Sequence, residues 1–379
     1  MRGQPSGQPI PPSERILALD VLRGFAMAGV LVAYCLWNLG TAPEESWSPL
    51  DRTLGEIAAL IIDGKFYTIL AFLFGLGFSI QLGRAASDAS AVDLYCRRLA
   101  ILAGIGLAHS LLLRNGDILL PYALTGFLLI PFRNAGSRTL FAAAVVALAV
   151  SPTVTLVTAQ LGWAVPDRPH LTGSSYLVEN MAWAQYWLRT AIFTWPTNLT
   201  LFLFGLYAGR HQLLQRLANR PRALVLIVLG GIFAGGLLHG ARLELVDMST
   251  ASGRAAAGLL FTFHCLGMSS GYAAAIILGL RSQAAAVILA PLASIGRLAL
   301  TNYLGQAALI VPLCLAFGWF DRFTPITSLS LALAVFLVQL AFSLLWVRRF
   351  SLGPAEWLWR SLTYGRPLEL GPRFDNASA

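Results

Sequence analysis

The residues best suited to chemistry in this sequence are ionisable side chains embedded in long apolar stretches. His109 lies in GIGLAHSLLLRNGDILL, and Arg114, Asn115 and Asp117 follow it closely. An imidazole beside a carboxylate is the arrangement of a general base, because the carboxylate fixes the tautomer and stabilises the imidazolium. We predict that His109 and Asp117 are a catalytic pair and that Arg114 and Asn115 contact the substrate. The alternative is a structural histidine bonded to a neighbouring helix.

Asp63 and Lys65 form a second group, at the outer end of another apolar stretch. They are either a boundary pair that reaches water or substrate-binding residues facing the same outer cavity as His109. His239 and His264 have no charged neighbour in the sequence, and we expect them to be structural.

A third group lies near the opposite ends of the apolar stretches. Arg23 and Arg297 could bind the phosphates of an anionic co-substrate, with Asn302 as a hydrogen-bonding partner, or could simply anchor helices at the headgroups. Asp20 precedes Arg23 by three residues, so the two share a helical face and can pair.

The amino-acid composition indicates that these polar groups lie in a membrane protein. Charged residues make up only 12% of the 379 residues, hydrophobic residues 56%, and the mean hydropathy is +0.67. A soluble chain has about 25% charged residues. The net charge of +9 does not indicate nucleic-acid binding, because the basic residues are dispersed between apolar runs rather than gathered on one face. The four cysteines are isolated, and we expect no metal site.

An all-α polytopic membrane protein with about ten transmembrane helices follows, since a bilayer core of about 30 Å needs roughly 20 apolar residues. The third and fourth candidates are short and are either tilted spans or a re-entrant hairpin buried in protein. The candidates are 22–38, 62–82, 99–113, 118–132, 139–161, 197–209 (extended upstream by 190–196), 223–241, 256–280, 298–317 and 327–347.

Loop charge sets the expected orientation. Alternating loops place eighteen Lys and Arg residues on one side and eight on the other, so the positive-inside rule puts both termini in the cytoplasm. We expect a flexible cytoplasmic N-terminal tail over 1–19, a transmembrane domain over 20–350 and a cytoplasmic C-terminal tail over 351–379.

Two stretches outside the plain spans carry further expectations. The connection 162–196 is rich in Tyr and Trp, which predicts an amphipathic helix on the outer interface, either as an aromatic belt or as a lid over an outward-facing site. The string FLFGL occurs at 72–76 and again at 202–206. Both copies would run from outside to inside, as in a parallel internal duplication, although chance can produce the same match.

Five strings together resemble the YeiB-like family of bacterial inner-membrane proteins, a group defined by a domain of unknown function. They occur in family order and span nearly the whole chain: LDVLRGFAMAGVL at 19–31, DGKFYTILAFLFGLGFSIQL at 63–82, RRLAILAGIGLAHSLLLRNGDILLPYAL at 97–124, GRLALTNYLGQ at 296–306 and GPAEWLWRSLTYG at 353–365.

That family in turn resembles the transmembrane acyltransferase superfamily. The resemblance implies transfer of an acyl group from a cytoplasmic acyl-CoA-type donor to a hydroxyl or amine of a small-molecule or glycan acceptor. Acyl-CoA would act as co-substrate, with no permanently bound cofactor. A lysosomal relative has its histidine in the outer loop after the first span, where this chain has none, so either His109 supplies the base or the chemistry differs.

We therefore expect a multi-pass protein of the bacterial cytoplasmic (inner) membrane, in contact with the lipid bilayer and not with nucleic acid; a homo-oligomer is compatible with the sequence. The leading function is an acyltransferase. The alternative is a small-molecule transporter or exporter that uses the same polar residues as gates and ion-coupling sites.

Overall fold

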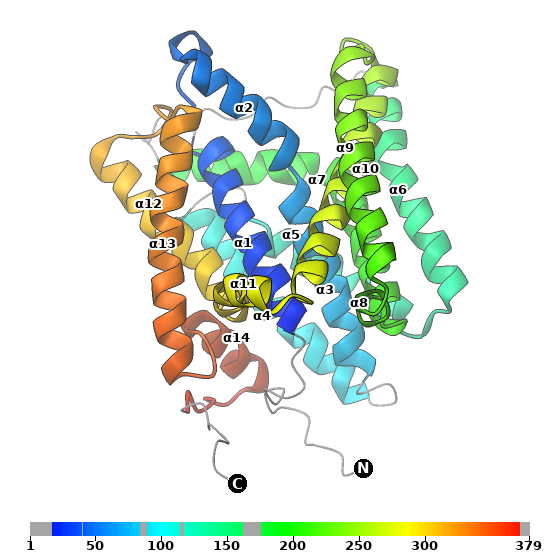
Figure 1. The fold of residues 1–379 in the computed structure, drawn as a ribbon, viewed down its shortest axis with the longest axis vertical. Helices are drawn as coiled ribbons and strands as arrows, with labels where there is room; N and C mark the ends of the chain where they lie inside the picture. Colours follow the sequence, from blue (N-terminus) through cyan, green and yellow to red (C-terminus); the bar gives the residue numbers. More distant parts are fainter. Residues whose placement is uncertain (1–16, 40, 84–88, 114–116, 162–175, 372–379) are drawn as a thin grey trace.

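The computed structural model describes residues 17–39, 41–83, 89–113, 117–161 and 176–371 (Figure 1). These residues form fourteen α-helices and two short 3₁₀ helices, which confirms the all-α fold. The elements are α1 (Leu17–Trp37), η2 (Glu44–Ser46), α2 (Pro49–Ile61), α3 (Lys65–Gly83), α4 (Ala89–Leu112), α5 (Leu119–Phe127), η3 (Ile130–Asn134), α6 (Ser137–Gln160), α7 (Tyr176–Arg210), α8 (Leu213–Ala218), α9 (Pro221–Glu244), α10 (Ala251–Gly279), α11 (Gln283–Arg297), α12 (Ala299–Phe317), α13 (Pro325–Arg349) and α14 (Pro354–Tyr364).

Seven helical stretches in the described residues are long and apolar enough to cross a membrane, and the bent α7 makes an eighth. The protein is therefore a multi-pass membrane protein with fewer spans than the ten stretches expected. The seven are α1, the joined α2–α3 over Pro49–Gln81, α6, α9, α10, α12 and α13.

The difference lies mainly in the stretches 99–113 and 118–132. The first belongs to α4, whose Asp93, Arg97 and Arg98 interrupt its apolar character. The second contains α5, whose 9 residues rise only about 14 Å and cannot cross a bilayer core. Of the two alternatives for this pair, a helix that returns inside the protein fits the length of α5.

The helix α7 matches the expected outer interfacial helix. It bends by 66° between Ala191 and Phe193, and its first arm lies crosswise to the neighbouring spans (Figure 1). The second arm begins near Pro196, a residue that cannot donate a helical backbone hydrogen bond.

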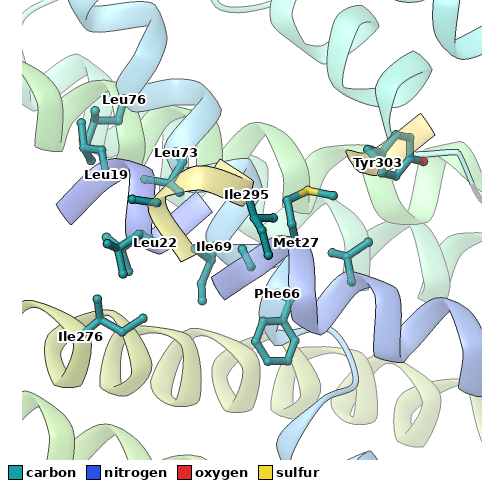
Figure 2. Close-up of a cluster of buried hydrophobic side chains, with 14 residues drawn as sticks. Leu19, Leu22, Met27, Phe66, Ile69, Leu73, Leu76, Ile276, Ile295 and Tyr303 are labelled. Carbon is teal, nitrogen blue, oxygen red and sulfur yellow. The ribbon is translucent and has the colours of Figure 1, made fainter. Parts of the chain in front are cut away.

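The core is built around α1, which packs against α3, α10, α11, α12 and α13. The span in α1 is 78% buried inside the protein, whereas that of α9 is only 11% buried, so α9 presents most of its surface outward. Figure 2 shows the apolar cluster, with Leu22 of α1, Phe66 and Ile69 of α3 and Ile295 of α11 close together. Tyr303 of α12 lies at its edge, and its hydroxyl points away from the cluster.

The two FLFGL strings pack directly on one another. A Cβ atom at Gly75 of α3 would collide with the Phe202 carbonyl of α7, and one at Gly205 of α7 would collide with the Phe72 carbonyl of α3. Equivalent residues thus make reciprocal contacts, and glycine permits the close backbone approach. This arrangement agrees with a parallel internal duplication.

Part of the C-terminal segment 351–379 is a packed helix. The helix α14 contacts α4 and α12, and its Trp359 donates from Nε1 to the Arg98 carbonyl of α4 at 3.0 Å. In Figure 1, α14 lies at the end of the molecule opposite the turn between α9 and α10. Residues 1–16, most of the expected N-terminal tail, lie outside the described residues.

Candidate functional site

The structure brings His109 and Asp117 together inside the protein. His109 Nδ1 lies 3.2 Å from Asp117 Oδ1, and the side chains are 4% and 3% exposed. His109 stands near the end of α4, and Asp117 precedes the start of α5. The predicted pair therefore joins the two arms of this helical hairpin.

Two hydrogen bonds hold the Asp117 carboxylate in place. Its Oδ2 accepts from the Leu120 amide in the first turn of α5 at 2.7 Å, and its Oδ1 accepts from the Tyr303 hydroxyl at 3.1 Å. A carboxylate at the start of a helix satisfies an amide that has no partner within that helix. A Cβ atom at Gly106 of α4 would lie 2.7 Å from Asp117 Oδ2, so glycine is needed here for α4 and α5 to approach. A Cβ atom at Gly104, by contrast, would meet nothing within 4 Å.

Tyr303 completes the group from α12. Its ring centroid lies 5.0 Å from that of His109, and its hydroxyl oxygen accepts from the Ile118 amide at 2.9 Å. Tyr303 therefore fixes both the carboxylate and the backbone at the start of α5.

His109 retains unused hydrogen-bonding capacity. Within the described residues neither ring nitrogen makes an aligned hydrogen bond, although Nδ1 is close to the Asp117 carboxylate. Catalytic hydrogen bonds are often poorly aligned before the substrate is bound. Nε2 is left as a buried atom able to exchange a proton with an incoming group.

The crosswise arm of α7 covers the end of α4. Asn180 Nδ2 donates to the Leu111 carbonyl at 3.1 Å, two residues beyond His109. Asn180 Oδ1 and Trp183 Nε1 are buried and have no hydrogen-bond partner among the described residues. The arm turns Leu177, Val178 and Leu188 outward. The lid and the aromatic belt both stay predictions.

The inner group is organised by Asp20. Its Oδ1 lies 3.4 Å from Arg23 NH1, and its Oδ2 lies 3.5 Å from Arg297 Nε. One carboxylate therefore lies between two guanidinium groups. A Cβ atom at Gly296 would collide with the Asp20 carbonyl, so close packing of α1 and α11 brings Arg297 onto Asp20.

Asn302 is placed differently from the prediction for a cofactor-binding residue. Its Nδ2 donates to the Ile295 carbonyl at 3.3 Å and to Ser343 Oγ at 2.9 Å, and its side chain is buried. Both amide protons are thus used in joining α11, α12 and α13. The Arg98 guanidinium lies 4.1 Å from the centroid of the Trp359 ring and within electrostatic range of Arg23.

The remaining predicted site residues are Asp63, Lys65, Arg114 and Asn115. Arg114 and Asn115 lie outside the described residues. Lys65 is fully buried, and its Nζ donates to the Ala59 carbonyl at the end of α2. No described contact joins Lys65 to His109; Lys65 and the backbone of Asp63 pack on α10 instead.

Sequence reasoning missed Tyr303, Asn180 and the second partner of Asp20. Tyr303 follows Asn302 directly in GRLALTNYLGQ, so the string that drew attention to Asn302 contained the more central residue. Within the described residues, no group of three or more His, Cys, Asp or Glu side chains could hold a metal ion.

Comparison with known proteins places the chain among bacterial relatives. It is 32% identical to an "uncharacterized 39.9 kDa protein in amylase 3′ region" of Bacillus acidopullulyticus, over 94% of this chain and 96% of the relative. It is 29% identical to the uncharacterized protein YxaH of Bacillus subtilis (strain 168), again over 94% and 96%. It is 28% identical to the uncharacterized protein YeiB of Escherichia coli (strain K12), over 92% and 96%.

A family model described as "Protein of unknown function (DUF418)" matches residues 208–366. No solved structure matches the chain. The match to this model and the near full-length similarity to YeiB and its relatives agree with the family expected from the five strings. The chain belongs to the DUF418 family.

Proposed function

We propose that the protein is a membrane-embedded acyltransferase with His109 as its general base. The observation that carries the proposal is the buried His109–Asp117 pair, with Nδ1 facing a carboxylate at 3.2 Å and Nε2 without a partner among the described residues. In this assignment Asp117 orients the imidazole, and Tyr303 positions Asp117.

The proposed step is an acyl transfer from a thioester. His109 Nε2 takes the proton of an acceptor hydroxyl or amine while the acceptor oxygen or nitrogen attacks the thioester carbonyl carbon. The carbon–sulfur bond then breaks, and the leaving thiolate receives a proton from the imidazolium. General-base catalysis of this type contributes about 10²- to 10⁴-fold to a rate.

The inner group supports an anionic donor such as acyl-CoA. Arg23 and Arg297 both lie against Asp20, and two neighbouring guanidinium groups suit a phosphate. Arg297 ends α11, and about 6 Å of helix rise separates Ala299 from Tyr303 on α12. In this proposal a thioester held by its phosphates at the inner end extends along α12 toward Tyr303 and His109. The cytoplasmic position of this end, in a bacterial inner membrane, is part of the proposal.

A transporter is the second candidate, favoured by the short α5 and the bend in α7. Interrupted helices of this kind bind substrates near the membrane midplane in many transporters. An acyltransferase would modify its substrate covalently, whereas a transporter would move it unchanged.

The deciding experiment supplies radiolabelled acetyl-CoA and a mixture of soluble sugars and amines to the purified full-length protein in detergent. Covalent label in a product supports acyl transfer. Flux of unmodified solute into proteoliposomes without any labelled product would contradict it and favour the transporter.

A further inference from the structure

A second polar cluster lies outside the His109 group, where α3, α9 and α10 meet. Lys65 of α3 and Arg242 of α9 both approach the ring of Phe261 on α10, with 5.9 Å from Nζ and 5.0 Å from Cζ to the ring centroid. Two like charges therefore lie near one aromatic ring. Cations inside a membrane protein are costly and usually mark a binding role.

Two histidines stand beside these cations. The ring centroids of His239 and His264 lie 4.9 Å apart, and His264 lies 6.2 Å from the Phe261 ring. Lys65 and Arg242 both act electrostatically on each histidine, and the Asp63 carboxylate acts on Lys65 and on His239. The expectation that these histidines have no charged neighbour is wrong, because Arg242 follows His239 by three residues in α9 and Lys65 acts on both histidines from α3.

The tautomer of His264 follows from its one hydrogen bond. Nδ1 lies 2.8 Å from the Gly235 carbonyl, which can only accept, so Nδ1 carries the proton. In neutral His264, Nε2 then carries a lone pair. This atom is buried in a side chain with 0% exposure and has no partner among the described residues. A buried acceptor without a donor is unfavourable, so a missing donor is implied.

The backbone of this region is built for close packing. Gly64 separates α2 from α3 with φ at +79°, and a Cβ atom there would lie 2.6 Å from Cys265 Sγ and 2.8 Å from the Phe261 ring. Ser269 Oγ donates to the Lys65 carbonyl at 2.8 Å. The break between α2 and α3 thus fixes Lys65 against α10, in a position that an unbroken helix would not give it.

We propose that Lys65, Arg242, His239 and His264 bind a phosphate group, at a site separate from the His109 group. Lys65 and Arg242 would donate to phosphate oxygens. A hydrogen phosphate or monoester also has an O–H that can donate to His264 Nε2, which a carboxylate lacks at neutral pH. His239 and Arg242 are only half-buried, so they form the entrance, and Lys65 and His264 form the floor.

The first experiment measures the melting temperature of the purified full-length protein in an uncharged detergent while inorganic phosphate replaces chloride at constant ionic strength. The wild type is expected to show a saturable increase. Arg242→Gln should weaken the apparent affinity by about 10-fold or more, the effect of losing a charge-assisted hydrogen bond. His239→Gln, which keeps both cations, is a second variant in case Arg242→Gln folds poorly.

Arg254→Gln is the matched control. Arg254 also lies at the α9–α10 end of the molecule, but it donates to the carbonyls of Met248 and Ser249 and is exposed. It should respond to phosphate like the wild type. Equal responses in the wild type, Arg242→Gln and His239→Gln would overturn the proposal, because the effect would then be a general salt effect.

A second experiment distinguishes a free phosphate from a lipid headgroup. The same proteins are placed in nanodiscs of phosphatidylcholine with or without phosphatidic acid, a phosphomonoester lipid that keeps the O–H. Stabilisation by phosphatidic acid that Arg242→Gln and His239→Gln reduce would support the site and identify the headgroup as the source. Stabilisation by inorganic phosphate in detergent, without stabilisation by the anionic lipid in nanodiscs, would support a soluble ligand. No response in the wild type to either would refute the site.

Discussion

Asp117 combines a structural and a chemical role in a single side chain. One oxygen accepts from the first turn of α5, and the other faces both His109 and Tyr303. The carboxylate cannot turn away from His109 without losing an amide and a hydroxyl partner. The positions of the possible base and of the α4–α5 hairpin therefore depend on the same residue.

Replacing His109 tests the base directly. His109→Gln is expected to lower the rate of label transfer from acetyl-CoA by about 10²- to 10⁴-fold while leaving the melting temperature close to that of the wild type. The control is His211→Gln, since His211 is a partly exposed residue whose ring nitrogen bonds Ser137 Oγ. Equal losses in both variants would make His109 structural.

Replacing Tyr303 tests its positioning role. Tyr303→Phe removes a donor to Asp117 and the acceptor of the Ile118 amide, so the free energy of unfolding should fall by about 1–3 kcal/mol. The measurement is unfolding by a denaturing detergent. Tyr186→Phe is the control, because the ring of Tyr186 packs on Trp183 and Trp187 at the protein surface. A loss no larger than in this control would contradict the role of Tyr303.

At the scale of helices, close backbone contacts determine which elements can pair. The α3–α7 contact depends on Gly75 and Gly205. Gly205→Ala should destabilise the protein by about 1–3 kcal/mol, because the added methyl group meets a carbonyl that belongs to a packed helix. Thermal unfolding of the purified variant measures the effect.

Gly230→Ala on α9 is the matched control, since a Cβ atom there meets nothing within 4 Å. It should be neutral or stabilising by up to about 1 kcal/mol, because alanine favours the helix over glycine. Similar destabilisation by both substitutions would show that helix propensity and not the α3–α7 contact is at work.

The docking of α14 should depend on pH through Glu356. Its carboxylate accepts from the Leu300 amide at 2.7 Å and the Thr301 amide at 3.2 Å, and from the Thr301 hydroxyl. Burial raises the pKa of Glu356. The hydrogen bonds lower the pKa, but their effect is smaller than that of burial. Because the pKa of Glu356 is higher in the folded protein, its protonated form stabilises the folded state. This stabilisation is complete below the ordinary pKa of about 4.3, and it is lost as the pH rises through the folded-state pKa.

Between pH 4 and the pH at which Glu356 is fully ionised, the melting temperature of the wild type should therefore fall relative to that of Glu356→Gln. The glutamine keeps an oxygen acceptor for the two amides but does not titrate. Parallel melting curves for the two proteins across this range would contradict the prediction.

At the scale of the whole molecule, eight spans including α7 place Leu17 and Gly371, the first and last described residues, on one side of the membrane. Gln215→Cys in α8 should resist a membrane-impermeant thiol reagent in intact cells, whereas Ser252→Cys at the start of α10 should react, since both positions are exposed and the loop charges favour α8 inside. The reverse labelling would invert the membrane orientation and move Arg23 and Arg297 to the outer side.

The sequence predicted local features better than contacts between distant segments. His109 and Asp117 could be paired from the sequence because one turn joins their helices. Tyr303 bonds Asp117 from 186 positions away, and no periodicity specifies which helix face meets which. The short α5 was ambiguous for a related reason, because an apolar run does not show whether its surroundings are lipid or protein.

The shared carboxylate of Asp20 has a consequence for biosynthesis. Asp20 and Arg23 enter the membrane with the first helix, but Arg297 follows 277 residues later, about 14–55 s at a synthesis rate of 5–20 residues per second. During that interval Arg23 is the local counterion that keeps Asp20 from standing alone in the bilayer. Arg297 then joins the pair when the C-terminal helices arrive, so this cluster closes late and couples the first helix of the nascent chain to its last third.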